Sequence, residues 1–348
     1  MTGVGAHDRC AEDVAVVVIG RNEGERLRRC LMSLSGKVRD IVYVDSGSLD
    51  GSVAFAASLG AHTIVLDTTL PFTAARARNA GFAYLQSLPD GLAYVQFVDG
   101  DCEVDPGWIA SSRDFLERTP QVGVAFGRRR ERFPERSIYN KLCDLEWDVP
   151  PGEVRSCGGD AMMRTAALEE VGGYRPDLIA GEEPELCVRL RARGWKIICL
   201  ALPMTLHDAD MMRFSQWWRR SVRSGYSFAQ GAHIHGGPPD YHWVKESRRA
   251  WIWGIGIPLL IVCGAVAFGR SALLLALIYP VQIARLYLKR QGTMAIPFAA
   301  SFFHVLGRFP EAIGQIMFLR DRLTGRTGQL IEYKSSSPTA RGHLRHDA

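Results

Sequence analysis

The sequence predicts an α/β domain followed by a transmembrane helical hairpin and an interfacial amphipathic helix. Short β-branched runs alternate with segments of helical apolar spacing from Val14 to Val98, which is typical of an α/β fold. Much later in the chain, Ala250–Gly269 carries no charged residue. With 47% hydrophobic and 23% charged residues, the composition excludes a disordered chain, a collagen and a coiled coil.

The first 245 residues are expected to form a parallel sheet covered by helices. Val14–Ile19 is largely β-branched, and leucines at positions 27, 31 and 34 give the following segment an apolar helical face. Active sites of such sheets gather at the carboxyl ends of the strands. We expect strands at Val14–Ile19, Ile41–Asp45, His62–Leu66, Ala93–Val98, Val122–Gly127 and Lys196–Leu200, and helices at Glu23–Leu34, Ser52–Leu59 and Ala74–Leu85.

Two apolar segments near the C-terminus predict the hairpin. Ala250–Gly269 has about the length that crosses a bilayer, and Ser271–Leu288 is nearly as apolar. A buried hairpin of a soluble protein is the alternative. Against it, the first segment is apolar on all faces, and Trp251 and Trp253 stand where membrane proteins place interfacial aromatics. We expect transmembrane helices at about 250–269 and 271–288.

Basic residues flank this hairpin on its outer sides, whereas only Arg270 lies in its turn. The positive-inside rule then places the N-terminal domain and the C-terminal tail in the cytoplasm. The flanking residues are Lys245, Arg248 and Arg249 before the hairpin and Lys289 and Arg290 after it.

The apolar segment at 295–319 carries polar or helix-breaking residues near its middle, which argue against a third crossing and favour a helix lying in the interface. These residues are His304, Arg308, Pro310 and Glu311. The expected division is an α/β domain at 1–245, a membrane region at 246–330 and a polar, disordered tail at 331–348.

The charge balance and the cysteines exclude further classes of protein. Lys and Arg number 42 against 37 Asp and Glu, and the resulting charge of +5 is too small for a nucleic-acid coat. The 8 cysteines form no C-x-x-C pair, which excludes a zinc ribbon and a thioredoxin-type site. We expect them to be reduced, as in a cytosolic compartment.

Acidic residues follow three of the predicted strands. Glu23 comes shortly after the first strand, Asp45 ends the second, and Asp99-Gly100-Asp101 follows the fourth. Close carboxylates repel one another unless a cation or hydrogen-bond donors lie between them. Oxygen ligands favour Mg²⁺ or Mn²⁺, which keep part of their coordination shell for a substrate phosphate.

With these features the sequence resembles the family 2 glycosyltransferases, whose nucleotide-sugar domain has the GT-A fold. Segments typical of the family occur in its order from about Val14 to Asp208. The resemblance implies an inverting, metal-dependent enzyme that uses a nucleotide-diphosphate sugar. The segments are VVVIGRNEGERLRRCLMSL, IVYVDSGSLDGS, FTAARARNAGF, VQFVDGDCEVDPGWI, CGGDAMMRTAALEEVGGY and GEEPELCVRLRARGW.

The hairpin is similar to that of bacterial members that build exopolysaccharides or other surface glycans on lipid carriers. This implies a polyprenyl-linked or other membrane glycan as the acceptor, and the lipid bilayer but no nucleic acid as a partner. It also implies a location at the bacterial inner membrane with the catalytic domain in the cytoplasm.

The resemblance implies roles for single residues on the donor side. Asp101 would ligate Mg²⁺ or Mn²⁺, and His207, just after the strand at 196–200 and its exit loop, would be a further ligand; a structural histidine is the alternative. The nucleotide-sugar contacts would come from Arg21 and Glu23 to the nucleoside, Asp45 to the base, Arg78 to the nucleotide and Asp99 to the ribose or sugar.

A glycine pair marks a second part of the site. Gly158 and Gly159 allow the backbone to approach a sugar or diphosphate closely, and Asp160 could accept bonds from sugar hydroxyls. A turn that serves packing alone is the alternative.

Glu183 stands where relatives commonly carry the catalytic base as Asp. An inverting transfer needs one carboxylate to deprotonate the acceptor hydroxyl. Glu182 and Glu185 lie beside it, and we expect the side chains of Glu182 and Glu183 to point in different directions. The alternative for all three is that they favour the helix macrodipole.

Two other functions stay open. A sugar nucleotidyltransferase would share the nucleotide-binding sheet, although Gly20-Arg21-Asn22-Glu23 lacks the basic, glycine-rich loop expected for a triphosphate. A catalytically degenerate membrane scaffold is the non-enzymatic alternative, against which Asp99, Asp101 and Glu183 argue. The run Arg128–Arg132 is expected to be a solvated face.

Overall fold

The first four strands pair as repeated βα units should. In the computed structural model, which describes residues 11–89 and 91–326, these strands are all parallel, and the predicted strands and helices of this part are confirmed. β1 (Ala11–Gly20) lies between β2 (Val38–Asp45) and β4 (Tyr94–Asp99), with β3 (His62–Val65) beyond β2. The connecting helices are α1 (Glu25–Leu34), α2 (Ser52–Ser58) and α3 (Ala74–Gln86).

Beyond β4 the sheet is mixed, so the expectation of a wholly parallel sheet is wrong. β8 (Ala161–Arg164) runs antiparallel to both β4 and β6 (Val122–Glu131). β9 (Lys196–His207) is parallel to β6, whereas β5 (Cys102–Val104) and β7 (Gly152–Glu153) pair antiparallel with β9. The regular βα alternation ends at β4, and the signal for parallel pairing ends with it.

β6 and β9 are longer than predicted, and this places two functional residues. β6 continues to Glu131 and β9 to His207, so His207 ends a strand and does not follow an exit loop. In the sheet register, His207 pairs with Glu131 on one side and Cys102 on the other.

The core lies on both faces of β1, whose side chains at 14–18 are fully buried. On α3, a Cβ at Gly81 would lie 2.4 Å from Val17 Cγ1, so the helix packs directly on this strand. This close packing fixes Arg78, which is on the same helix one turn earlier. The other helices of the domain are α4 (Trp108–Arg118), η1 (Pro134–Arg136), α5 (Ile138–Glu146), α6 (Thr165–Glu170), α7 (Glu182–Ala192) and α8 (Phe214–His235).

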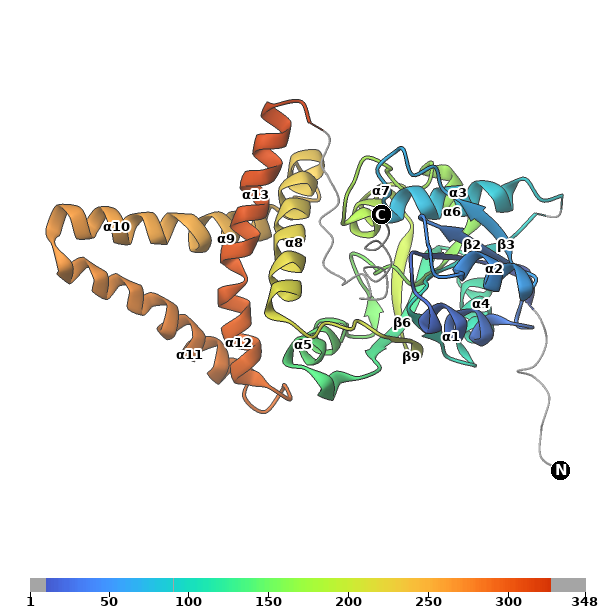
Figure 1. Ribbon diagram of the computed structural model, residues 1–348, viewed down its shortest axis with the longest axis horizontal. Helices are drawn as coiled ribbons and strands as arrows, with labels where there is room; N and C mark the ends of the chain where they lie inside the picture. The colour runs from blue at the N-terminus through green and yellow to red at the C-terminus, as the bar shows by residue number, and fades with distance from the viewer. Residues whose placement is uncertain (1–10, 90, 327–348) are drawn as a thin grey trace, which may run out of the picture.

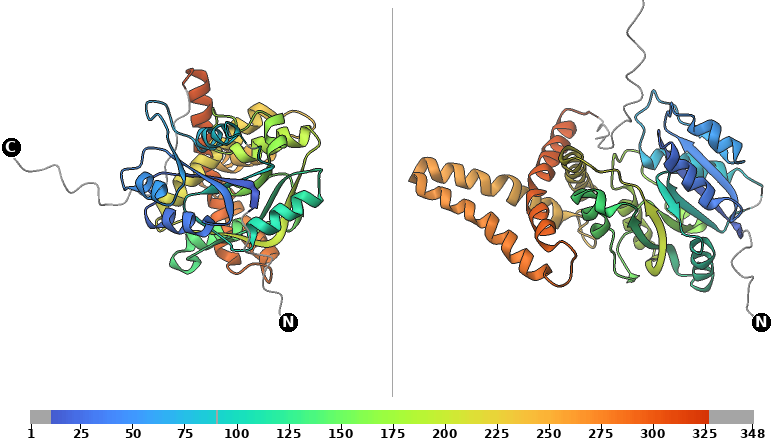
Figure 2. Two further views of the ribbon diagram at one scale, coloured as in Figure 1. Left: turned by 90° about the vertical axis from the view of Figure 1, so that its right-hand side faces the viewer. Right: turned by 60° about the horizontal axis from the view of Figure 1, so that its bottom comes forward.

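A helical hairpin projects from the end of the molecule that lies opposite the sheet (Figures 1 and 2). Its arms, Val244–Phe268 and Arg270–Arg290, are long and apolar enough to cross a membrane, and neither is buried in the protein. The arms consist of α9 (Val244–Trp251), η2 (Ile252–Gly256), α10 (Ile257–Phe268), η3 (Arg270–Leu277) and α11 (Ile278–Arg290).

The segment predicted as one interfacial helix at 295–319 forms two helices, α12 (Pro297–Leu306) and α13 (Arg308–Leu323), joined at Gly307. They run across the base of the hairpin, and α13 lies along α8 (Figure 1). Gly225 of α8 and Gly314 of α13 allow this contact, because a Cβ at either would lie 2.0 Å from a backbone oxygen of the other helix. The predicted tail at 331–348 is outside the described residues.

Candidate active site

The loops after β1 and β2 form one edge of the candidate site. Asn22 donates its backbone N–H to Ser48 Oγ (2.8 Å), and its side-chain oxygen accepts from the Leu49 N–H (2.8 Å). Gly24 donates to Asp50 Oδ2 at 2.9 Å. These bonds join the two loops into a single rim at the carboxyl ends of the strands.

Asp45 is buried beneath this rim. Its Oδ1 accepts from the Tyr43 hydroxyl at 2.8 Å, and its Oδ2 accepts from the N–H groups of Gly47 and Ser48 at 2.8 and 2.7 Å. The Asp45 carboxylate therefore stabilises the loop that follows β2. A hydrogen bond from a nucleobase has to use the lone pairs of the carboxylate that remain.

Arg21 and Glu23 lie on the rim itself. The exposed guanidinium of Arg21 stacks 4.4 Å from the ring centre of Phe72, which precedes α3. Glu23 pairs with Arg26 one turn later, at 2.9 Å. Arg21 and Phe72 together offer a flat surface of the kind that stacks against a nucleobase.

Arg78 joins the two halves of the site. From its buried position on α3, Nη2 contacts Asp99 Oδ1 at 2.9 Å, and Nη1 contacts Glu182 Oε1 at 2.8 Å and Glu183 Oε1 at 3.0 Å. Although burial lowers the pKa of Arg78, the surrounding carboxylates raise it well above its usual range. The guanidinium is therefore a permanent cation between the end of β4 and the start of α7.

The three glutamates at the start of α7 differ in what they contact. The expectation that Glu182 and Glu183 diverge is wrong, because both reach the same nitrogen of Arg78. Glu185 turns away to Arg189 (2.8 Å) and to His235 Nε2 (2.9 Å). Of the three side chains, Glu183 is the most exposed at 14%, against 5% for Glu182 and 1% for Glu185.

The environment of Glu183 suits a proton acceptor. Burial, and then the negative charge of Glu182, raise the pKa of Glu183 to about 7, against the opposing effect of Arg78. A general base works best when its pKa lies near the operating pH. Glu183 is thus a partly accessible carboxylate that can take up a proton near neutral pH.

Asp160 lies behind Asp99 and does not present a free oxygen. It is fully buried; its Oδ1 accepts from the Asp99 N–H at 2.9 Å. Its Oδ2 accepts from the Thr205 hydroxyl at 2.8 Å and pairs with Arg129 Nη2 at 2.9 Å. The structure therefore makes Asp160 a residue that positions Asp99, in place of the direct contact with sugar hydroxyls that the sequence suggested.

Arg129 corrects the expectation that Arg128–Arg132 is a solvated face. Its guanidinium lies 3.6 Å from Asp99 Oδ2 and 5.5 Å from the ring centre of Trp147. Burial raises the pKa of Asp99, but Arg78 and Arg129 hold it below its usual range. Because β6 continues through this run, successive side chains point to opposite faces of the sheet. This alternation is the signal by which the sequence could have indicated that not all of these arginines face solvent.

Gly159 lies against the central ion pair. A Cβ there would come within 2.6 Å of Arg78 Nη2 and 2.7 Å of Asp99 Oδ2, whereas a Cβ on the exposed Gly158 would meet nothing. The glycine pair therefore has one member required by close packing and one that faces open space.

Asp101 and His207, the two residues predicted to ligate a metal ion, face each other. Asp101 Oδ2 lies 3.3 Å from His207 Nε2, and both side chains are buried. On the other side of the ring, His207 Nδ1 lies 3.6 Å from Glu131 Oε2, in the manner of a carboxylate that orients a metal-bound histidine. An oxygen and an imidazole nitrogen brought together in this way fit a divalent cation.

Cys102 lies between two groups of possible ligands. The ligand atoms of Asp101, Cys102 and His207 lie within 4.8 Å of one another, and so do those of Asp99, Cys102 and Asp160. A thiol is a soft ligand, whereas Mg²⁺ and Mn²⁺ favour oxygen. The donor chemistry therefore favours Asp101 and His207.

Comparison with known proteins shows that the chain is similar to glycosyltransferases. Residues 15–172 match the model of Glycosyl transferase family 2. A pre-mycofactocin glycosyltransferase of Mycobacterium tuberculosis is 28% identical in an alignment of 236 residues that covers 64% of this chain and 48% of the relative. The cellulose synthase 1 catalytic subunit of Komagataeibacter xylinus is 24% identical over 185 residues, 47% of this chain and 23% of the relative. The chain thus spans about half, or less, of the length of these relatives.

A solved structure shares the fold over most of the chain. A mannosyltransferase from Pyrobaculum calidifontis, in complex with GDP-Man and Mn²⁺, is 18% identical with a TM-score of 0.56, and the match covers 90% of each chain. The likeness confirms the predicted GT-A fold.

Proposed function

Residues 15–172 of this chain are a family 2 glycosyltransferase domain, and from this premise we propose that the protein is an inverting, metal-dependent transferase that acts at a membrane. In this proposal a sugar moves from a nucleotide-diphosphate donor to a lipid-linked acceptor at the cytoplasmic face. The product contributes to an exopolysaccharide or another surface glycan.

The observation that carries the proposal is the bridge made by Arg78. One buried guanidinium contacts Asp99, at the strand end where a nucleotide sugar is expected, and Glu183, the proposed base. In this proposal the donor and the acceptor therefore bind on either side of this one side chain.

Glu183 accepts the proton of the acceptor hydroxyl. The acceptor oxygen forms its bond to the anomeric carbon from the face opposite the diphosphate, and the nucleoside diphosphate departs with the electron pair of the broken bond. Asp99, held by Arg78 and Arg129, contacts the ribose or the sugar. Arg21 on its Phe72 platform contacts the nucleoside.

Asp101 and His207 would hold Mg²⁺ or Mn²⁺, and the ion when bound supplies positive charge that stabilises the diphosphate leaving group. Glu131 orients the imidazole of His207 from behind. The solved mannosyltransferase that shares the fold carries GDP-Man and Mn²⁺, a donor and an ion of the classes proposed here.

The hairpin supports a membrane location. Its 2 arms have the length and composition to cross a bilayer, and the basic residues at both outer ends favour a cytoplasmic position for the domain. A membrane-anchored domain of this kind reaches acceptors whose lipid part stays in the same bilayer.

A donor screen tests the proposal. Membranes that contain the protein are incubated with UDP-sugars and GDP-sugars, and both the released nucleoside diphosphate and the sugar in the lipid fraction are measured. One donor is expected to give the two products in equal amounts, with loss of both in EDTA and in Asp101→Asn. Release of inorganic diphosphate from a nucleoside triphosphate and a sugar phosphate would instead identify a nucleotidyltransferase, and no turnover with any donor would favour a scaffold.

A further inference from the structure

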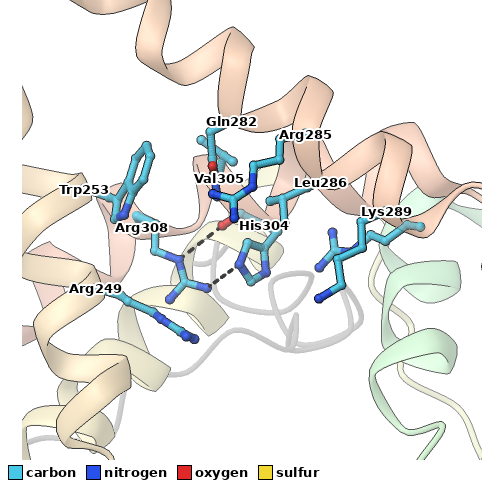
Figure 3. Close-up of a pocket in the computed structure, with 10 residues that line it drawn as sticks. Arg249, Trp253, Gln282, Arg285, Leu286, Lys289, His304, Val305 and Arg308 are labelled. Atoms are coloured by element: carbon cyan, nitrogen blue, oxygen red, sulfur yellow. Dashed lines mark hydrogen bonds between the residues drawn. The ribbon is translucent and has the colours of Figure 1, made fainter.

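A basic cavity lies at the base of the hairpin, apart from the sugar site. Its volume is about 350 Å³, and it opens between α11 and α12 beside the ends of α9 and α13. Figure 3 shows cationic side chains from these elements turned toward one space. The polar lining consists of Arg249, Gln282, Arg285, Lys289, Arg290, His304 and Arg308.

The cavity has far more positive than negative charge. Among the described residues, Arg308 is the one lining cation with an acidic side chain within 4.0 Å, namely Glu311 at 2.7 Å. Arg290 Nη1 donates to the neutral Ser301 hydroxyl at 3.5 Å. Burial, followed by the charges of Arg308, Arg290 and Arg249, lowers the pKa of His304 to about 4, so at neutral pH its ring is uncharged. Gathered cations of this kind attract an anion.

The rest of the lining is apolar and belongs to the membrane-facing part of the molecule. Trp253, Leu286 and Val305 complete the walls. Trp253 follows the first basic flank, at the level where tryptophans gather between the lipid chains and water. A ligand with both an anionic group and hydrocarbon would use the two kinds of wall, whereas a free anion would use the charges alone.

We propose that this cavity binds the phosphate group of an anionic membrane phospholipid. Basic cavities between transmembrane helices on the cytoplasmic side recognise such headgroups. The proposal rests on the membrane location proposed above and is independent of sugar transfer, because α8 and α13 stand between the hairpin and α7, which carries Glu183 (Figure 1). Three of the flanking residues, Arg249, Lys289 and Arg290, thus belong to one binding site in addition to favouring the proposed orientation of the hairpin.

Native mass spectrometry of the full-length protein in detergent tests the proposal. The protein is titrated with phosphatidylglycerol and, separately, with phosphatidylcholine, in the absence of nucleotide sugar. Phosphatidylglycerol is expected to bind more tightly, and Arg285→Gln/Lys289→Gln is expected to weaken it by about fivefold for each cation removed. The matched control Lys245→Gln/Arg248→Gln removes the same charges from the same membrane face but outside the cavity, and it should retain wild-type affinity.

Further measurements distinguish a phospholipid site from other causes of phosphatidylglycerol binding. Inorganic phosphate should not displace the bound lipid, and displacement would mean a site for free anions. Equal binding of the two lipids, or equal loss in both double variants, would also overturn the proposal. If Arg285→Gln/Lys289→Gln fails to fold, Arg249→Gln, from the other arm of the hairpin, should show the fivefold loss. Glu183→Gln should bind phosphatidylglycerol as the wild type does, so a failure of the catalytic proposal remains distinguishable.

Discussion

At the scale of single residues, Arg78 is the side chain on which the proposed site depends. It is 1% exposed and contacts carboxylates from two separate elements, Asp99 from β4 and Glu182 and Glu183 from α7. A buried cation is stable only when it is paired. The same contacts that pair the charge of Arg78 therefore hold the proposed base in position before any substrate binds.

The pH dependence of turnover should report the proton on Glu183. Because the pKa of Glu183 is raised to about 7 and the base must be deprotonated, kcat is expected to rise with pH through about 7 and to level off above it. Glu182→Gln removes a negative charge that raises this pKa, so the rise should move to lower pH. Measured kcat–pH profiles should show no such shift for Glu185→Gln, because Glu185 is held by Arg189 and His235. If both variants showed the same shift, or neither shifted, the pH profile would not report the proton on Glu183.

The two glycines before Asp160 should respond differently to a methyl group. Gly159→Ala places a Cβ against Arg78 and Asp99, so kcat is expected to fall by at least tenfold, whereas Gly158→Ala meets open space and should stay near the wild type. Steady-state kinetics of the two variants provide the measurement. Equal activities would mean that the ion pair of Arg78 and Asp99 moves aside without consequence.

The sequence predicted most of the residues that the structure brings together, but neither Arg129 nor the contact of Glu182 with Arg78. Arg78, Asp99, Asp101, Glu183 and His207 lie in motifs that can be recognised one at a time. Arg129 sits in a run of arginines, and its pairing with Asp160 depends on two segments that are distant in sequence. The alternation of side chains along a strand could indicate that one of these arginines faces inward, but not which remote carboxylate pairs with it.

At the scale of elements, the parallel half of the sheet was predictable and the mixed half was not. Each strand from β1 to β4 carries its own β-branched run, and each following helix has its own apolar spacing. β6 instead continues through a run of charged residues as far as Glu131, and β9 continues past Pro203 as far as His207, because the two strands pair with each other there. Pairing with a neighbour extends a strand beyond the residues whose own sequence favours it.

The contact between α8 and α13 gives a test at this scale. Gly225→Ala would place a Cβ 2.0 Å from the Glu311 carbonyl oxygen, so the variant is expected to lose about 1–3 kcal/mol of stability through overpacking. Thermal unfolding in detergent should show a lower Tm for Gly225→Ala than for Gly237→Ala, whose Cβ would contact nothing. Identical Tm values would mean that α13 does not lie against α8 as described.

At the scale of the whole molecule, the hairpin and the sheet occupy opposite ends (Figure 2). Large side chains such as Leu260, Val266 and Leu274 are exposed on the hairpin. An apolar surface of this extent needs a partner or a membrane. Hydrophobicity is a property of each segment alone, which is why the hairpin was predictable, whereas its attachment through α12 and α13 depends on remote contacts.

Cysteine labelling tests the orientation of the hairpin. With the exposed Cys263 replaced by serine, a cysteine at Ser271 in the turn should react with a membrane-impermeant maleimide added to intact cells. A cysteine at Ser58, exposed on the sheet domain, should react only after the cells are opened. Labelling of Ser58→Cys in intact cells, with Ser271→Cys protected, would reverse the proposed topology.

The most direct test of the central claim is sugar transfer by Glu183→Gln compared with the wild type, once a donor has been found. The amide keeps the size of the carboxylate but cannot accept the proton, so kcat should fall by about 10²–10⁴-fold. The affinity for the nucleotide sugar should stay nearly unchanged, because in the proposal Arg21 and Asp99 contact the donor and Asp101 holds the metal ion. A Glu183→Gln enzyme with wild-type kcat would contradict the assignment of Glu183 as the base and, with it, the proposed mechanism.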